Sequence, residues 1–142
     1  MKIKVIDFGY EKLPERKHYN DTGADVYLTR NLVLEPHETK VVPVGFGINL
    51  PDGYNAHFQT RTSVAKDGVF VQQCAIDAGY KGEISLIVTN LTNKPKIYPK
   101  GQRLAYLEIY PIVYADFVKD LGEERGSGAF GSTNKSEDNN GK

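Results

Sequence analysis

Two stretches of the sequence combine side chains that could bind or activate an anionic ligand. Asp21-Thr22-Gly23-Ala24-Asp25 places two carboxylates around a glycine, directly before a predicted strand. Thr60-Arg61-Thr62-Ser63 brings a guanidinium and hydroxyls to the possible start of a helical turn, a combination that suits a phosphate. Each stretch also has a simpler structural interpretation, which is a β-turn entry for the first and a capped helix with a surface arginine for the second.

A turn and a tail form the other two candidate stretches. The turn, Cys74-Ala75-Ile76-Asp77-Ala78-Gly79-Tyr80-Lys81-Gly82-Glu83, lies between the apolar runs 69–71 and 84–88. Its aspartate follows small and apolar residues, so partial burial is expected, although a turn-capping role is the alternative. In the tail stretch RGSGAFGST, glycines allow backbone N–H groups to approach a phosphate, while Arg125 supplies charge. A plain linker would need neither Arg125 nor Phe130.

Short alternating segments must position these side chains. Alternation predicts half-buried strands, and Gly, Pro and Asn separate the segments. The predicted strands span residues 2–8, 25–28, 32–34, 41–50, 55–59, 69–71, 83–90 and 103–110. Many short strands with turn residues between them predict an all-β sandwich or closed barrel. The sequence has no long amphipathic segment; residues 63–66 could form a turn or two of helix, and residues 115–121 at most a short piece.

Length, charge and cysteine content narrow the class of protein. A chain of 142 residues with 39% hydrophobic residues can form one packed domain. Its 18 basic residues balance its 18 acidic ones, which argues against electrostatic capture of nucleic acid. The single cysteine excludes an intramolecular disulfide and fits a reducing, cytoplasmic compartment. Because no apolar run approaches the roughly 20 residues of a membrane span, we expect no membrane association.

The sequence predicts two regions of different character. Residues 1–124 carry the strands and are expected to form the folded all-β domain. Residues 125–142 are rich in Gly, Ser and Asn, and only Ala129 and Phe130 are apolar there. Such a segment cannot bury enough apolar surface to order itself, so we expect a flexible tail that carries the glycine-rich motif.

Taken in order, the stretches DTGADVYL, TRTS, AIDAGYKGEI, KGQRLAYLEIYP and RGSGAFGST closely resemble the sequence motifs of the homotrimeric dUTP pyrophosphatases (dUTPases). The resemblance implies that residues 1–124 form the catalytic domain, a distorted jelly-roll β-barrel, which agrees with the all-β pattern. It also implies Mg²⁺-dependent hydrolysis of dUTP to dUMP and pyrophosphate. The active sites would be shared among the subunits of a homotrimer.

The resemblance also assigns roles to the residues of the turn. Asp77 matches the catalytic aspartate that orients and activates the water attacking the α-phosphorus. Tyr80 matches the aromatic residue that packs against the deoxyribose and leaves no room for a 2′-hydroxyl. The backbone of Cys74, Ala75 and Ile76 corresponds to a hairpin edge that reads uracil by hydrogen bonds and excludes cytosine.

Phosphate and metal roles fall on the other motifs. Arg61, Thr62 and Ser63 correspond to the phosphate-binding motif, and Asp25 to an aspartate that contacts Mg²⁺ through water. Phe130 corresponds to an aromatic residue that stacks over the base, in a tail expected to close over the substrate. The residues that correspond to γ-phosphate ligands are Arg125, Ser132 and Thr133.

The chain departs from the usual motifs at several positions, and two alternative functions remain open. Thr60 replaces a common proline, Cys74 a common glycine and Tyr106 the usual glutamine. A dCTP deaminase shares the fold, but it needs a glutamate as proton shuttle where this chain has Ile87. A non-enzymatic regulatory or binding protein on the same scaffold is the other alternative.

Overall fold

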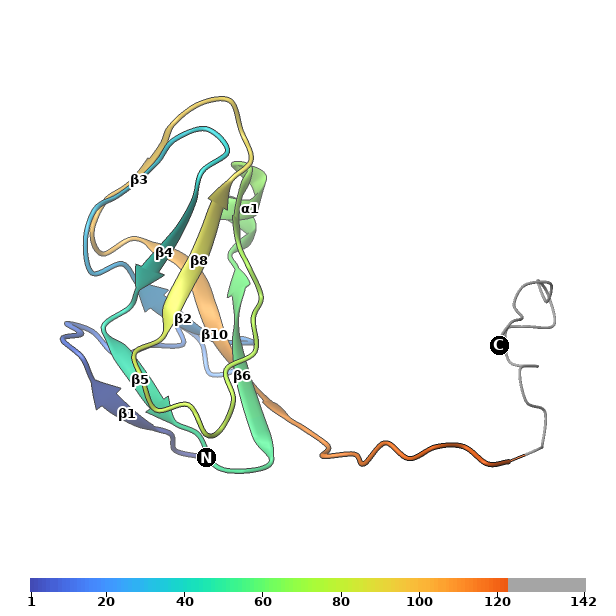
Figure 1. The fold of residues 1–142 in the computed structure, drawn as a ribbon. Coiled ribbons are helices and arrows are strands. Elements are labelled where there is room, and N and C mark those ends of the chain that lie inside the picture. Colours follow the sequence, from blue (N-terminus) through green and yellow to red (C-terminus); the bar gives the residue numbers. More distant parts are fainter. Residues whose placement is uncertain (123–142) are drawn as a thin grey trace, which may run out of the picture.

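The computed structural model describes residues 1–122 and shows a barrel of short strands with one short helix (Figure 1). The predicted all-β class is confirmed. The helix is α1 (Thr62–Lys66). The strands are β1 (Lys4–Asp7), β2 (Ala24–Tyr27), β3 (Leu32–Leu34), β4 (Thr39–Pro43), β5 (Phe46–Asn49), β6 (Tyr54–Thr60), β7 (Val69–Val71), β8 (Ser85–Asn90), β9 (Lys96–Tyr98) and β10 (Arg103–Pro111).

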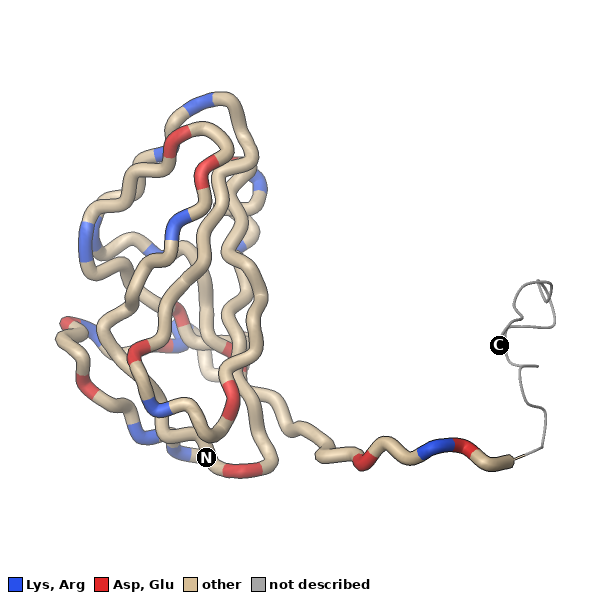
Figure 2. Tube along the Cα trace, in the orientation of Figure 1, with Lys and Arg blue, Asp and Glu red and all other residues tan. Residues whose placement is uncertain are grey.

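The strands form small antiparallel sheets around one core. Their orders are β1-β5, β2-β10-β6, β3-β9 and β4-β8-β7. Alternation along β8 places Leu86, Val88 and Asn90 inside, as expected for a strand with one buried face. The strands β8 and β10, each the central strand of a three-stranded sheet, lie near the centre of the view in Figure 1. Acidic and basic residues are interspersed along the trace, as Figure 2 shows.

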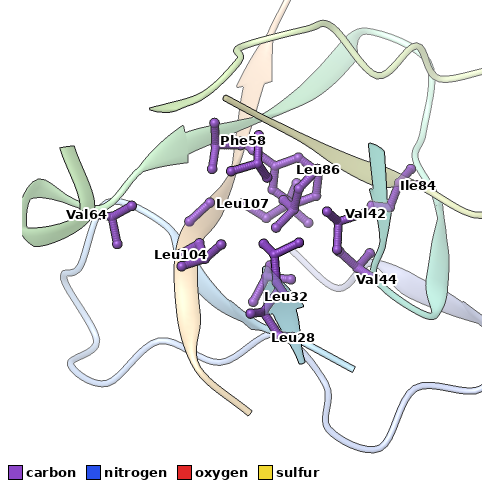
Figure 3. Close-up of a cluster of buried hydrophobic side chains, with 14 of the residues drawn as sticks. Leu28, Leu32, Val42, Val44, Phe58, Val64, Ile84, Leu86, Leu104 and Leu107 are labelled. Atoms are coloured by element: carbon purple, nitrogen blue, oxygen red, sulfur yellow. The ribbon is translucent and has the colours of Figure 1, made fainter. Parts of the chain in front are cut away.

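A cluster of aliphatic and aromatic side chains fills the barrel. Figure 3 shows Phe58, Leu86 and Leu107 close together, with Leu104 and Leu32 beside them. These residues come from the strands β3, β6, β8 and β10, which belong to three different sheets. The cluster therefore joins the separate sheets into one unit. Burial of this apolar surface is the main force that holds so many short strands in place.

Three details differ from the expectations. The sequence pattern predicts one strand over residues 41–50, but the chain breaks at Gly45, which has a φ of 82°. The break separates β4, which pairs with β8, from β5, which pairs with β1. The pattern does not predict the strand β9 (Lys96–Tyr98), and residues 115–121 form no helix.

The segment that follows β10 leaves the barrel. In Figure 1, residues 112–122 run away from the sheets as an extended arm. Apolar side chains on this arm are strongly exposed, with Phe117 at 96% and Leu121 at 85%. Within residues 1–122, no helix is long and apolar enough to cross a membrane.

Candidate active site

A polar pocket of about 510 Å³ brings the first two sequence motifs together. All four of the predicted residues that belong to these motifs line it: Asp25, Arg61, Thr62 and Ser63. The other lining residues come from the loop before β2 and from β10: Lys17, His18, Asp21, Thr22, Gly23, Arg103 and Tyr106. The pocket therefore joins three segments that are far apart in the sequence.

An irregularity in β10 turns two of its side chains toward the pocket. Simple alternation would place Arg103 and Tyr106 on opposite faces of the strand. The register against β2 shifts between Arg103 and Ala105, so that Leu104 and Ala105 are both buried. Such a shift reverses the alternation beyond it. Arg103 and Tyr106 consequently both reach the pocket, which the sequence pattern did not indicate for Arg103.

Charged groups in this pocket form a connected network. Arg103 Nη1 lies 2.9 Å from Asp25 Oδ2, and both side chains are largely buried. Arg61 Nη1 donates to the backbone carbonyl of Arg103 at 3.1 Å, which directs the second guanidinium to the same place. Within residues 1–122, Asp25 Oδ1 has no hydrogen-bond donor. The arrangement offers two guanidinium groups and one free carboxylate oxygen to a ligand.

Gly23 has a packing role beside this network. A Cβ atom at Gly23 would lie 2.5 Å from the ring carbon Cδ1 of Tyr106 and 2.7 Å from the Leu107 carbonyl oxygen. Only a glycine allows β10 to approach so closely. Burial raises the pKa of Tyr106, and the negative charge of Glu108 adds to this effect. Both effects favour the protonated phenol, which is a hydrogen-bond donor.

The second motif lies where β6 passes into α1. Arg61 precedes the helix in an extended conformation, and its side chain is held by Arg103. Thr62 and Ser63 are exposed at the start of the helix and line the pocket, so their hydroxyls are near enough to bind a ligand there. Thr60 has a structural role, because its hydroxyl bonds the N–H and C=O of Val71 and ties β6 to β7.

A second pocket, of about 300 Å³, surrounds the turn between β7 and β8. Its lining includes the residues predicted there: Cys74, Ala75, Ile76, Asp77 and Tyr80. Residues that were not predicted complete it: Phe58, Gln72, Glu83, Ile84, Ser85 and Ile87. Contrary to the partial burial expected from its apolar neighbours, Asp77 is exposed at the turn, and its backbone carbonyl accepts the Tyr80 N–H. Its carboxylate can thus reach a water molecule.

The backbone of this turn is only partly available to a ligand. Ile76 donates its N–H to Ala56 at 2.7 Å and accepts the Ala56 N–H at 3.1 Å. Within the described residues, the backbone groups of Cys74 and Ala75 have no such partner. The backbone groups of Cys74 and Ala75 are therefore available to a ligand, while the buried Ile76 side chain anchors the turn.

Hydrogen bonds hold the ring of Tyr80 across the turn. The Tyr80 hydroxyl donates to the Glu83 carbonyl at 2.8 Å. A Cβ at Gly82 would lie 2.6 Å from the same hydroxyl, so a larger residue would displace the ring. The Glu83 carboxylate accepts the Gly45 N–H at 2.9 Å, which connects the turn to the break between β4 and β5. The ring position is therefore built into the fold.

The two pockets have no lining residue in common within the described part of the chain. Asp77 and Tyr80 line one, whereas Asp25 and Arg61 line the other. Four predicted site residues lie outside the described residues: Arg125, Phe130, Ser132 and Thr133. One chain thus presents two half-sites of different chemistry, one cationic and one suited to a ring.

Comparison with known proteins identifies the family. The family model described as dUTPase matches residues 10–134. The chain belongs to the dUTPase family. It is 38% identical to the deoxyuridine 5′-triphosphate nucleotidohydrolase of Clostridium tetani, over 95% of this chain and 97% of the relative. The corresponding enzyme of Orientia tsutsugamushi strain Boryong is 36% identical, over 94% of this chain and 98% of the relative.

A solved structure bears on the fold of this dUTPase. A point variant of the dUTPase from phage phi11 of S. aureus, described with a structural Mg(II) ion, superposes with a TM-score of 0.81. It shares 22% sequence identity, and the match covers 87% of this chain and 99% of the phage chain. At this identity the comparison bears on the fold alone. The dUTPase-type barrel predicted from the sequence motifs is confirmed.

Proposed function

We propose that this dUTPase hydrolyses dUTP to dUMP and pyrophosphate, with Asp77 as the catalytic residue. The observation that carries the proposal is the pairing of two half-sites. One pocket offers Arg61, Arg103 and Asp25 to a triphosphate and its cation, and the other offers Asp77 and Tyr80 to a nucleoside. Each half-site matches one end of the substrate.

In the proposed reaction, Asp77 accepts a hydrogen bond from water and directs it at the α-phosphorus. The bond from the water oxygen to the α-phosphorus forms as the bond to the bridging oxygen of the β-phosphate breaks. Pyrophosphate is the leaving group, and the water proton passes to the Asp77 carboxylate. The exposed position of Asp77 at the turn leaves space for both water and substrate. The guanidinium groups of Arg61 and Arg103 would stabilise charge on the phosphates.

The donors of the cationic pocket fit a hydrated Mg²⁺ ion. Within residues 1–122, no group of three or more His, Cys, Asp or Glu side chains could hold a metal. Mg²⁺ commonly uses one or two carboxylates together with waters and phosphate oxygens, which the single free oxygen of Asp25 allows. A bound Mg²⁺ would neutralise part of the triphosphate charge. Arg103 keeps the Asp25 carboxylate oriented toward that position.

Selectivity would arise at the turn. The Tyr80 ring, held by Glu83 and Gly82, would pack against the sugar where a 2′-hydroxyl would otherwise lie. The free backbone groups of Cys74 and Ala75 would read the uracil edge. Ile87 lines this pocket, and an aliphatic side chain cannot move a proton to a base. This residue argues against the alternative of a dCTP deaminase.

We propose that a complete site combines residues from more than one copy of the chain, in a homotrimer with shared sites. The proposal is supported by the two half-sites, which share no lining residue within residues 1–122. The extended arm 112–122 supports it as well, because exposed Val113, Phe117 and Leu121 are stabilised when a second copy covers them. In the tail, Phe130 would stack on the base, while Arg125, Ser132 and Thr133 would bind the γ-phosphate.

Subunit mixing tests the shared site. Arg61→Ala and Asp77→Asn would each inactivate the enzyme, but the two substitutions fall in different half-sites. When the variants are unfolded and refolded together, roughly a quarter of the sites should combine an intact Arg61 with an intact Asp77 from another chain. Recovery of activity on mixing is expected, and each variant refolded alone is the control. No recovery, in mixtures shown to be trimeric, would mean that each site lies within one chain.

A further inference from the structure

The loop between β1 and β2 is tied directly to a residue of the cationic pocket. Glu15 donates its N–H to the Asp25 carbonyl at 3.1 Å and accepts the Asp25 N–H at 2.8 Å. The Tyr27 hydroxyl also donates to the Glu15 carboxylate at 3.1 Å. One end of the segment 15–21 is therefore attached to β2 beside Asp25.

A closed turn fixes the other end of the segment. Asp21 Oδ2 accepts the His18 N–H at 2.8 Å, and the Asp21 N–H donates to the His18 carbonyl at 3.1 Å. Backbone N–H groups at His18 and Lys17 lower the pKa of Asp21, so this carboxylate stays ionised and retains the turn at neutral pH. Lys17 lies between the two attachments and lines the pocket together with Arg61 and Ser63.

Two cations of the pocket have no acidic partner among residues 1–122. Arg103 pairs with Asp25, and His18 lies beside Asp21 at 3.5 Å. Among the described residues, neither Lys17 nor Arg61 has a carboxylate within ion-pair distance. An ammonium group on a flexible stem binds phosphate oxygens as a point charge, without the geometric demands of a guanidinium.

We propose that Lys17 is a phosphate ligand of this dUTPase, held over the pocket by the Glu15–Asp25 bridge and the His18–Asp21 turn. The inference rests on the proposed function in that the polyphosphate it binds is that of dUTP. Lys17 would act on the phosphates of substrate and product, and would make no contribution to recognition of the base, which belongs to the other half-site.

Lys12 provides a matched control in the same loop. Its Nζ lies 4.4 Å from the centre of the Tyr27 ring and 3.5 Å from Glu15, and it does not line the cationic pocket. Lys12→Gln thus removes the same charge from the same loop at a place outside the pocket. Lys17→Arg keeps the charge at position 17.

Calorimetric binding of pyrophosphate in the presence of Mg²⁺ is the direct test, with deoxyuridine as a second probe. Lys17→Gln should weaken pyrophosphate binding about fivefold, the scale of one partly exposed charge contact. Lys12→Gln and Lys17→Arg should bind pyrophosphate like the wild type, and deoxyuridine binding should be unchanged in all variants. The KM for dUTP should rise in Lys17→Gln while kcat changes little.

Two results would overturn the inference. The first is pyrophosphate binding by Lys17→Gln that equals that of Lys12→Gln. The second is an equal loss of pyrophosphate and deoxyuridine binding, which would indicate a general effect on the fold. Neither result is the same as failure of the proposed function. If the proposed function is wrong, the wild-type protein does not hydrolyse dUTP, whatever Lys17 binds.

Discussion

Arg103 of β10 and Asp25 of β2 form an ion pair of 2.9 Å between neighbouring strands, although the ladder places Arg103 opposite Tyr27 and Asp25 opposite Tyr106. The carbonyl of the same arginine accepts a hydrogen bond from Arg61. The first residue of β10 thus holds the proposed metal-contacting aspartate with its side chain and the proposed phosphate-binding arginine with its backbone. We therefore expect phosphate binding and barrel stability to be coupled through Arg103.

Arg103→Gln should reduce both properties at once. Loss of a charged hydrogen bond at a largely buried position is expected to lower the free energy of unfolding by about 1 to 3 kcal/mol. The KM for dUTP should also rise, because Asp25 loses its orientation. Urea unfolding of Arg103→Gln, Asp25→Asn and the double variant measures the coupling. Additive losses in this cycle would show that the two side chains do not interact in solution.

Two substitutions of Tyr80 separate its ring from its hydroxyl. Tyr80→Phe keeps the ring but loses the bond to the Glu83 carbonyl, so it should retain most of the preference for dUTP over UTP. Tyr80→Ala removes the ring and should lose much of that preference. The measurement is kcat/KM on both nucleotides for each variant. A folded Tyr80→Ala enzyme with the full preference would place recognition of the sugar elsewhere.

The hydrogen bond of Tyr110 should make the free energy of unfolding depend on pH in the alkaline range. Its hydroxyl donates to Glu108 at 2.8 Å, and this bond raises the pKa of Tyr110 above its usual value of about 10. The protonated phenol is therefore favoured in the folded state. Its contribution is fully present below about pH 10 and is lost as pH rises through the folded-state pKa.

The difference in unfolding free energy between the wild type and Tyr110→Phe isolates this contribution. We expect the difference to be constant between about pH 7 and pH 9 and to shrink at higher pH. Urea unfolding of both proteins across this range gives the values. A difference that grows with pH would contradict the assigned hydrogen bond.

Truncation after Glu124 separates the barrel from the glycine-rich motif. Since the core lies within the sheets and the turns that join them, the melting temperature should change little. Catalytic efficiency on dUTP should fall steeply, because base stacking on an aromatic side chain is worth roughly 1 to 3 kcal/mol and Arg125 is also lost. Both properties are measured on the same preparation. If melting and activity fall together, the tail is part of the fold; if neither changes, it is no lid.

Much of the architecture could be predicted because it depends on local pattern. The alternation along residues 85–90 and the turn residues between short strands can be recognised from neighbouring residues alone. The turn that holds Asp77 could be predicted from the strands on either side of it. The motif residues of the cationic pocket came from resemblance. Asp25 lies in β2 and Arg61 directly follows β6, and both strands pair with β10. This shared neighbour brings the two residues together, and the motifs alone do not reveal it.

Features that depend on tertiary contacts could not be predicted. The break at Gly45 reflects the bond of its N–H to Glu83, and the two residues are distant in the sequence. Arg103 reaches the pocket only because the register shifts against β2. Lys17 lies in a polar loop without a periodic pattern, and its position depends on the backbone bridge between Glu15 and Asp25.

Pyrophosphate release by wild type and Asp77→Asn, with Mg²⁺ and with dUTP, dCTP, dTTP or UTP, tests the central claim most directly. We predict that the wild type strongly prefers dUTP and that Asp77→Asn still binds dUTP. Its kcat should be at least about a hundredfold lower, the scale of a lost general base. Near-normal turnover of dUTP by Asp77→Asn would contradict the assignment of Asp77 as the residue that activates water.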